Sequence, residues 1–177
     1  MTTSWDDRYA QRTQRMTGSV IRELLKFTEE PDMISFAGGM PAPDAFPTKE
    51  FTDACNLVLQ EQSEQALQYG STDGYYPLRN MIANQSRRYG IEVTPENILI
   101  TSGSQQALDL LGKIFINTGD RIVVENPTYV GALQAWNAYG AEYIPVPFDD
   151  EGMITSGGAM THARRIPGAR VLEKVLV

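Results

Sequence analysis

The order of apolar and polar residues predicts alternating strands and helices in the middle of the chain. Three short apolar runs have the length of buried strands, and two segments between them carry apolar residues at helical spacing. These elements are the strands 98–101, 121–125 and 141–148, the helix face Ala107, Leu110, Leu111, Ile114 and Phe115, and the helix face Tyr129, Ala132, Leu133 and Trp136. The alternation predicts an α/β fold with parallel neighbouring strands. Pro145 and Pro147 place the last strand at or near a sheet edge.

The first third of the chain has a different pattern. Residues 1–30 are mostly polar, and the stretch "MISFAGGMPAPDAFP" reads as an extended arm crossing a surface. Thr48 is suited to cap a helix that follows. Apolar residues recur at helical spacing in that helix, at Phe51, Ala54, Cys55, Val58 and Leu59. We therefore predict that the single cysteine is a buried apolar residue rather than a nucleophile.

Composition narrows the function classes. The chain has 177 residues, is 42% hydrophobic and carries a net charge of −7 with no basic block. The negative charge disfavours binding to nucleic acid or to an anionic membrane. One cysteine allows no internal disulfide, and no apolar run reaches the length of a membrane span. These features predict a cytoplasmic protein, and no metal site is predicted.

A corner of small polar residues is the first candidate site. The run Ile98-Leu99-Ile100 reaches Thr101-Ser102-Gly103-Ser104, and a helical pattern follows at once. A helix N-terminus offers unpaired N–H groups, and Gly103, Ser104 and Gln105 would suit a phosphate or carboxylate there. The alternative is an ordinary N-cap, in which Ser102 or Ser104 satisfies only its own helix. The pattern lacks the lysine of a P-loop and the glycine spacing of a dinucleotide fold, which disfavours a nucleotide.

Four segments in series resemble one family. They are "SFAGGMPAPDAFP", "LQYGSTDGYYPLR", "ILITSGSQQALDLLGKIF" and "VVENPTYVGALQAW". Together they resemble the N-terminal part of the class I/II, fold-type I pyridoxal-phosphate aminotransferases, nearest to the 2-aminoadipate and kynurenine aminotransferase branch. The resemblance covers about residues 17–154. It implies an N-terminal arm at 1–47, part of a three-layer αβα large domain with an incomplete sheet at 48–154, and a tail at 155–177 outside the family pattern.

The resemblance implies a role for seven residues. The cofactor phosphate would lie at Gly103, Ser104 and Gln105, and the Tyr129 ring would stack on the pyridine ring. Tyr69 would reach the phosphate of a neighbouring subunit in a homodimer. Gly39 would lie near the substrate α-carboxylate, and Arg22 near the distal carboxylate of an acidic substrate. Each also has a plainer reading: Tyr129 as a core aromatic, Tyr69 and Arg22 as surface residues, and Gly39 as a turn before Pro41.

The chain departs from the family pattern at its most important position. In the family a lysine in a Ser-rich segment forms the Schiff base with the cofactor, and none of the lysines here has that context. These lysines are Lys26, Lys49, Lys113 and Lys174. We therefore expect no catalytic residue in this chain, non-covalent cofactor binding at best, and a fragment that is inactive alone. His162, in the tail, is given no role.

The missing pattern also bears on folding. In the family the strands absent here lie between strand 98–101 and the next two strands. We expect strand 98–101 to lack its usual neighbour, so that only a rearranged sheet would hold the phosphate corner and Tyr129 together. Exposed strand edges invite aggregation, which predicts a marginal or aggregation-prone chain.

Two classes of function remain open. The first is transfer of an amino group between an amino acid and a 2-oxo acid, with pyridoxal 5′-phosphate as cofactor. The second is a non-catalytic remnant, or a phosphate-binding or dimerising module; an unrelated α/β anion-binding domain is a distant third. Related lyases share the same motifs, and the amino donor stays open. A transcriptional regulator is disfavoured, because no DNA-binding domain precedes Ile34.

Overall fold

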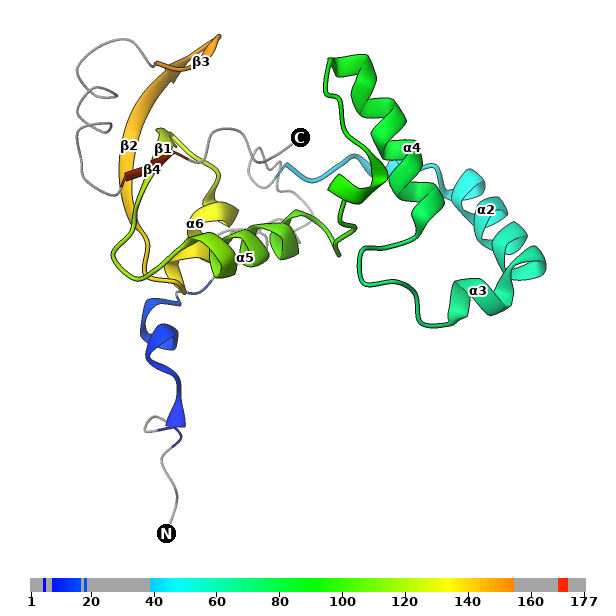
Figure 1. Cartoon of the computed structure of the whole chain (residues 1–177), viewed down its shortest axis with the longest axis horizontal. Helices are drawn as coiled ribbons and strands as arrows, with labels where there is room; N and C mark the ends of the chain where they lie inside the picture. The colour runs from blue at the N-terminus through cyan, green and yellow to red at the C-terminus, as the bar shows by residue number, and fades with distance from the viewer. Residues whose placement is uncertain (1–4, 6–7, 17, 19–38, 155–168, 172–177) are drawn as a thin grey trace, which may run out of the picture. The chain divides into compact units, whose positions relative to one another are not determined.

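The computed structural model describes residues 5, 8–16, 18, 39–154 and 169–171. Contacts divide the chain into two compact units, one formed by Met1–Ser19 with Ser102–Val177 and the other by Val20–Thr101. In chain order the elements of the described part (Figure 1) are the 3-10 helices η2 (Gln11–Arg15) and η3 (Pro43–Ala45), the helices α2 (Thr48–Glu61), α3 (Ser63–Leu67) and α4 (Tyr76–Ser86), the 3-10 helices η4 (Arg87–Tyr89) and η5 (Pro95–Asn97), helix α5 (Ser104–Phe115), strand β1 (Arg121–Asn126), helix α6 (Val130–Asn137), and the strands β2 (Glu142–Asp149), β3 (Gly152–Met153) and β4 (Ala169–Val171).

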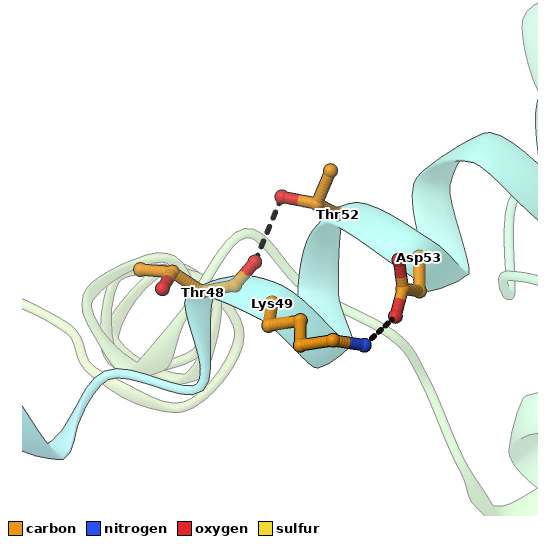
Figure 2. A network of polar contacts seen from close by, with 4 residues as sticks. All are labelled: Thr48, Lys49, Thr52 and Asp53. Carbon is orange, nitrogen blue, oxygen red and sulfur yellow. Dashed lines mark hydrogen bonds and ion pairs between the residues drawn. The ribbon is translucent and has the colours of Figure 1, made fainter.

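Helix α2 forms where the apolar spacing predicts a helix, but Thr48 does not cap it. The N-cap is Pro47, and no side chain donates or accepts a capping bond there. Instead the Thr52 hydroxyl donates to the Thr48 carbonyl oxygen at 2.7 Å, and Lys49 pairs with Asp53 at 2.7 Å (Figure 2). These local contacts lie within the first turns of the helix itself.

The predicted burial of the α2 apolar face is wrong. None of the residues of α2 is buried, and the side chain of Cys55 is exposed. In the described part of the chain, the main contacts of α2 are with its neighbour α3. Helical spacing creates an apolar face, but a second element must cover that face before it becomes core.

The prediction of a strand at 98–101 is also wrong. The described residues show no ladder there; the Ile100 N–H donates to the Asp73 carbonyl oxygen at 3.0 Å. A strand exists only by pairing with another strand, and none of the described strands pairs with this run. Arg79, 8% exposed, fixes the same region by donating to the carbonyl oxygens of Gly74 (3.1 Å) and Pro95 (2.9 Å).

The other unit contains the parallel sheet that the sequence predicts. The described strands form a sheet in the order β3-β2-β1-β4, with β1 parallel to both β2 and β4. Pro145 and Pro147 lie opposite Val124 and Asn126 of β1, whereas β3 pairs only with the end of β2. Strand β2 therefore lies next to the edge strand β3 in the described sheet, which agrees with the predicted position at or near an edge.

The core of this unit lies between β1 and the helix pair α5 and α6, which are side by side (Figure 1). Ile122 and Val124 of β1 join it from one face of the sheet, and Val123 packs with Val146 on the other. This alternation follows from the period of two along a strand. The remaining members of the first cluster are Leu108, Ile116, Ala132, Ala135 and Trp136.

The predicted apolar face of α5 is partly wrong. Ile114 is 69% exposed and Phe115 45% exposed, whereas Leu108 and Gly112 are buried. The helix is therefore rotated relative to the expected stripe. Gly112 packs closely on the rings of Trp136 and Tyr139, because a Cβ there would lie 2.9 Å from the first and 2.7 Å from the second.

Candidate functional site

The polar corner forms the N-terminus of α5, as the sequence predicts. Gly103 is the N-cap, and its backbone has φ +85° and ψ 172°, a combination that is essentially restricted to glycine. A Cβ at Gly103 would meet nothing within 4 Å, so the requirement for glycine in the chain itself comes from the backbone angles.

The alternative of an ordinary serine cap finds no support in the geometry. The N-cap residue is Gly103, which has no side chain, so neither Ser102 nor Ser104 occupies the N-cap position. The Ser102 N–H instead donates to the Gln106 side-chain oxygen. Ser104, the first residue of the helix, is exposed, and the first turn of a helix carries the positive end of its dipole. The corner can therefore present N–H groups and a hydroxyl to an anion.

Gln105 links this corner to α6. Its side-chain nitrogen donates to the Gly131 carbonyl oxygen at 3.3 Å. The sequence predicts Gln105 as a phosphate ligand, whereas the structure directs this amide contact to the neighbouring helix. The backbone N–H of Gln105 still belongs to the first turn of α5, where an anion would lie.

Tyr129 stands at the N-cap of α6 and is 52% exposed. Its ring lies against the backbone of Gly131, since a Cβ there would be 2.6 Å from two ring carbons and 2.7 Å from the hydroxyl oxygen. The plainer reading of Tyr129 as a core aromatic does not hold, because half of the side chain remains accessible. The Tyr129 ring thus packs against the backbone of Gly131, and about half of the residue remains accessible to a ligand.

Gly103, Ser104, Gln105 and Tyr129 are brought together by helix packing. The sequence led us to expect that only a rearranged sheet could do this, and the described sheet does lack a strand at 98–101. The contact between α5 and α6 and the bond from Gln105 to Gly131 hold the corner beside Tyr129. The sheet supports this site through the apolar core that it shares with the two helices.

The other predicted site residues belong to the Val20–Thr101 unit. Tyr69 is 99% exposed, and its backbone N–H donates to the side-chain oxygen of the adjacent Gln68 at 2.9 Å. Gly39 has φ +58°, which suits the turn before Pro41. Arg22 lies outside the described residues. The roles of these three residues stay predictions.

The two described lysines occupy ordinary helix surfaces. Lys49 forms an i,i+4 ion pair with Asp53, and both side chains are mostly exposed (Figure 2). Lys113 lies exposed in the last turn of α5, where a cation interacts favourably with the helix dipole. Lys26 and Lys174 lie outside the described residues.

Sequence reasoning missed Gly131 altogether. The available signal was a glycine two positions after the aromatic residue, inside a segment with helical spacing. Glycine is unfavourable within a helix, so such a position often has a packing reason. That reason here is the Tyr129 ring.

None of the described helices is long and apolar enough to cross a membrane. No group of three or more His, Cys, Asp or Glu side chains gathers among the described residues to hold a metal ion.

Comparisons with known proteins agree with the resemblance seen in the sequence. The family model described as "Aminotransferase class I and II" matches residues 31–177, which includes the tail expected to lie outside the family pattern. Aromatic-amino-acid aminotransferase 1 of Thermococcus litoralis is 49% identical over 153 residues, covering 86% of this chain and 37% of that protein.

Solved structures give the same result. The α-aminoadipate aminotransferase LysN of Thermus thermophilus, complexed with N-(5′-phosphopyridoxyl)-L-leucine, is 43% identical with a TM-score of 0.74, over 86% of this chain and 36% of that one. The kynurenine aminotransferase of Pyrococcus horikoshii is 46% identical with a TM-score of 0.76, over 85% of this chain and 37% of that one. The chain thus spans little more than a third of the length of the relatives it matches.

Proposed function

Because this chain belongs to the class I and II aminotransferases, we propose that it supplies part of the cofactor site of an enzyme that moves an amino group between an amino acid and a 2-oxo acid. The observation that carries the proposal is the Gln105–Gly131 hydrogen bond, which joins the α5 N-terminus to the helix that begins at Tyr129. Through it, one unit of the chain offers both an anion-binding helix end and an accessible aromatic face.

The residues present fit pyridoxal 5′-phosphate. Gly103, at the N-cap of α5, has no side chain to cover the helix end, and the space around its Cβ position is open. The Ser104 hydroxyl and the first N–H groups of α5 would hold the phosphate. The exposed side of the Tyr129 ring would cover one face of the pyridine ring, exclude water there and hold its tilt. When bound, the cofactor supplies an electron sink for the amino acid.

The remaining partners are proposed from the family pattern. Tyr69, almost fully exposed, would serve the phosphate site of a second copy in a homodimer. Gly39 would face the α-carboxylate of the amino acid, and Arg22 a distal carboxylate where the substrate has one. The relatives are named for aromatic amino acids, α-aminoadipate and kynurenine, which supports a site open to more than one side chain.

A second reading is a phosphate-binding module without chemistry. The positions of the two described lysines favour this reading, since Lys49 and Lys113 lie on exposed helix surfaces and neither lies in the site. Both readings predict that the isolated 177-residue chain has no transaminase activity. They differ in whether a longer or assembled protein completes the site.

Binding by the purified chain tests the proposal. Pyridoxamine 5′-phosphate is the probe, because its amine cannot condense with surface lysines. We expect binding that quenches protein fluorescence, competes with inorganic phosphate, and weakens in Ser104→Ala and in Tyr129→Leu. Absence of binding in the wild-type chain would contradict the assignment of the site. Turnover with an amino donor, 2-oxoglutarate and pyridoxal 5′-phosphate would contradict the expectation that the chain is inactive alone.

A further inference from the structure

Building on the proposed function, we propose that Gln105 and Gly131 are positioning residues that set the place of the Tyr129 ring relative to the phosphate corner. Gln105 sits in the turn that would hold the phosphate, and its amide donates to the Gly131 carbonyl oxygen at 3.3 Å. The Tyr129 ring in turn packs against the backbone of Gly131. The chain of contacts therefore runs from the anion site to the base of the aromatic ring.

Gly131 provides the space in this arrangement. The Cε1, Cζ and hydroxyl oxygen of Tyr129 lie 2.6, 2.6 and 2.7 Å from the place where a Cβ at Gly131 would be. Carbon atoms do not approach that closely, so any other residue at 131 would displace the ring. Alanine is a better helix former than glycine, which means that helix stability does not account for a glycine here. The ring is the physical reason for it.

Gln105 provides the link. Gly131 is buried in the first turn of α6, and a side-chain bond to its carbonyl oxygen fixes that turn against α5. If this bond is lost, the first turn of α6 can shift and carry the ring away from the phosphate corner. Gln105 would then affect a ligand that has an aromatic ring, and not a bare phosphate. A direct phosphate ligand would affect both.

This difference defines the experiment. Gln105→Glu keeps the size of the side chain but removes the donor to Gly131. Gln106→Glu is the matched control, because it adds the same charge at the next position and keeps the oxygen that accepts from the Ser102 N–H. Affinities for pyridoxamine 5′-phosphate and for inorganic phosphate are measured for both variants of the full 177-residue chain.

We expect Gln105→Glu to bind pyridoxamine 5′-phosphate about fivefold more weakly than Gln106→Glu, as for the loss of one hydrogen bond. The two variants should bind inorganic phosphate equally. In a Tyr129→Leu background the difference between them should disappear. An equal loss of both ligands in Gln105→Glu, relative to Gln106→Glu, would identify Gln105 as a phosphate ligand and overturn the proposal.

A second variant, Gly131→Ala, and an NMR measurement without ligand test the positioning role independently of the Gln105→Glu affinities. Because alanine favours the helix, Gly131→Ala should fold and bind inorganic phosphate as the wild type does, yet lose affinity for pyridoxamine 5′-phosphate. The Tyr129 ring resonances, recorded by NMR without ligand, should shift in Gly131→Ala and Gln105→Glu but not in Gln106→Glu. Unchanged resonances in both variants would overturn the positioning role. A wild-type chain that binds neither ligand but shows these shifts would contradict the proposed function and retain the positioning role.

Discussion

The indole Nε1–H of Trp136 donates to the carbonyl oxygen of Leu108 at 3.0 Å, and both residues are buried. The bond crosses from α6 to α5 inside the core that underlies the candidate site. It lies in the same helix pair as the Gln105–Gly131 contact, and Gly112, one turn further along α5, leaves room for the Trp136 ring.

Replacement of Trp136 by Phe should lower the free energy of unfolding by about 1–3 kcal/mol. The indole donor is lost, and the smaller ring leaves a void beside Leu108. Urea unfolding followed by far-UV circular dichroism measures this. Trp5→Phe is the control, since Trp5 is 67% exposed, and it should change the free energy by less than about 0.5 kcal/mol. Equal effects of the two substitutions would contradict the structural role of the Trp136 bond.

Replacement of Gly103 by Ala should destabilise the unit that contains α5. A residue with a Cβ is strained at φ +85° and ψ 172°, and the cost is about 1–3 kcal/mol. The measurement is urea unfolding followed by Trp136 fluorescence in a Trp5→Phe background. Ser104→Ala should leave stability unchanged while weakening phosphate binding. If Gly103→Ala is as stable as its parent, the backbone at this corner differs from the one described.

Tyr143 should make the stability of the chain sensitive to alkaline pH. Burial raises the pKa of its hydroxyl to about 12, and that hydroxyl lies 3.1 Å from the Leu133 carbonyl oxygen and 2.9 Å from the Asn137 side-chain oxygen. The neutral form is the one favoured by folding. Its contribution is complete below the unfolded pKa of about 10 and is lost as the pH rises through about 12, because the unfolded chain ionises first.

The test compares urea unfolding of the wild type and Tyr143→Phe from about pH 9 to about pH 11. The wild type should lose stability more steeply over this interval than the variant. Parallel curves would show that Tyr143 does not carry the dependence. The titration of Tyr139 must be included when the stability curves are fitted, since burial and its bond to Asp109 also raise the pKa of its hydroxyl.

The isolated chain should be marginally stable or prone to aggregation. Among the described residues of the Val20–Thr101 unit, Ala83 is the buried apolar side chain, whereas Phe51 is 71% exposed and Leu67 78% exposed. Exposed apolar side chains in such number favour association. Light scattering and a thermal scan should show oligomers and a broad transition, and Phe51→Ser with Leu59→Ser should raise the monomer fraction. A sharp, cooperative transition from a monodisperse sample would contradict this.

The elements predicted well from the sequence are those whose partners are close in the chain. Strands β1 and β2 have the predicted positions, and α6 lies between them, because each element supplies the apolar surface that the next one covers. The corner at Gly103 was also identifiable, since a glycine and small hydroxyls between a strand-like run and a helix are a local signal.

The errors arise where structure depends on a distant partner. The run 98–101 has a strand composition, but pairing decides whether a strand forms. Cys55 lies on an apolar stripe of α2, but the stripe alone does not show whether another element packs against it. The contact between Gln105 and Gly131 joins residues 26 positions apart, and no periodicity within either helix reports it.

The parallel pairing of β1 with β2 has a consequence for the order of folding. Arg121 and its partner Glu142 are 21 positions apart, not far above the shortest crossover that a parallel pair allows. The entropic cost of closing a loop rises with its length, so this β–α–β unit should close early. In pulse-labelled hydrogen exchange, the β1 amides should gain protection before that of Ile100 does. The aromatic half of the candidate site would then be assembled, on a chain still leaving the ribosome, as soon as Asp149 emerges.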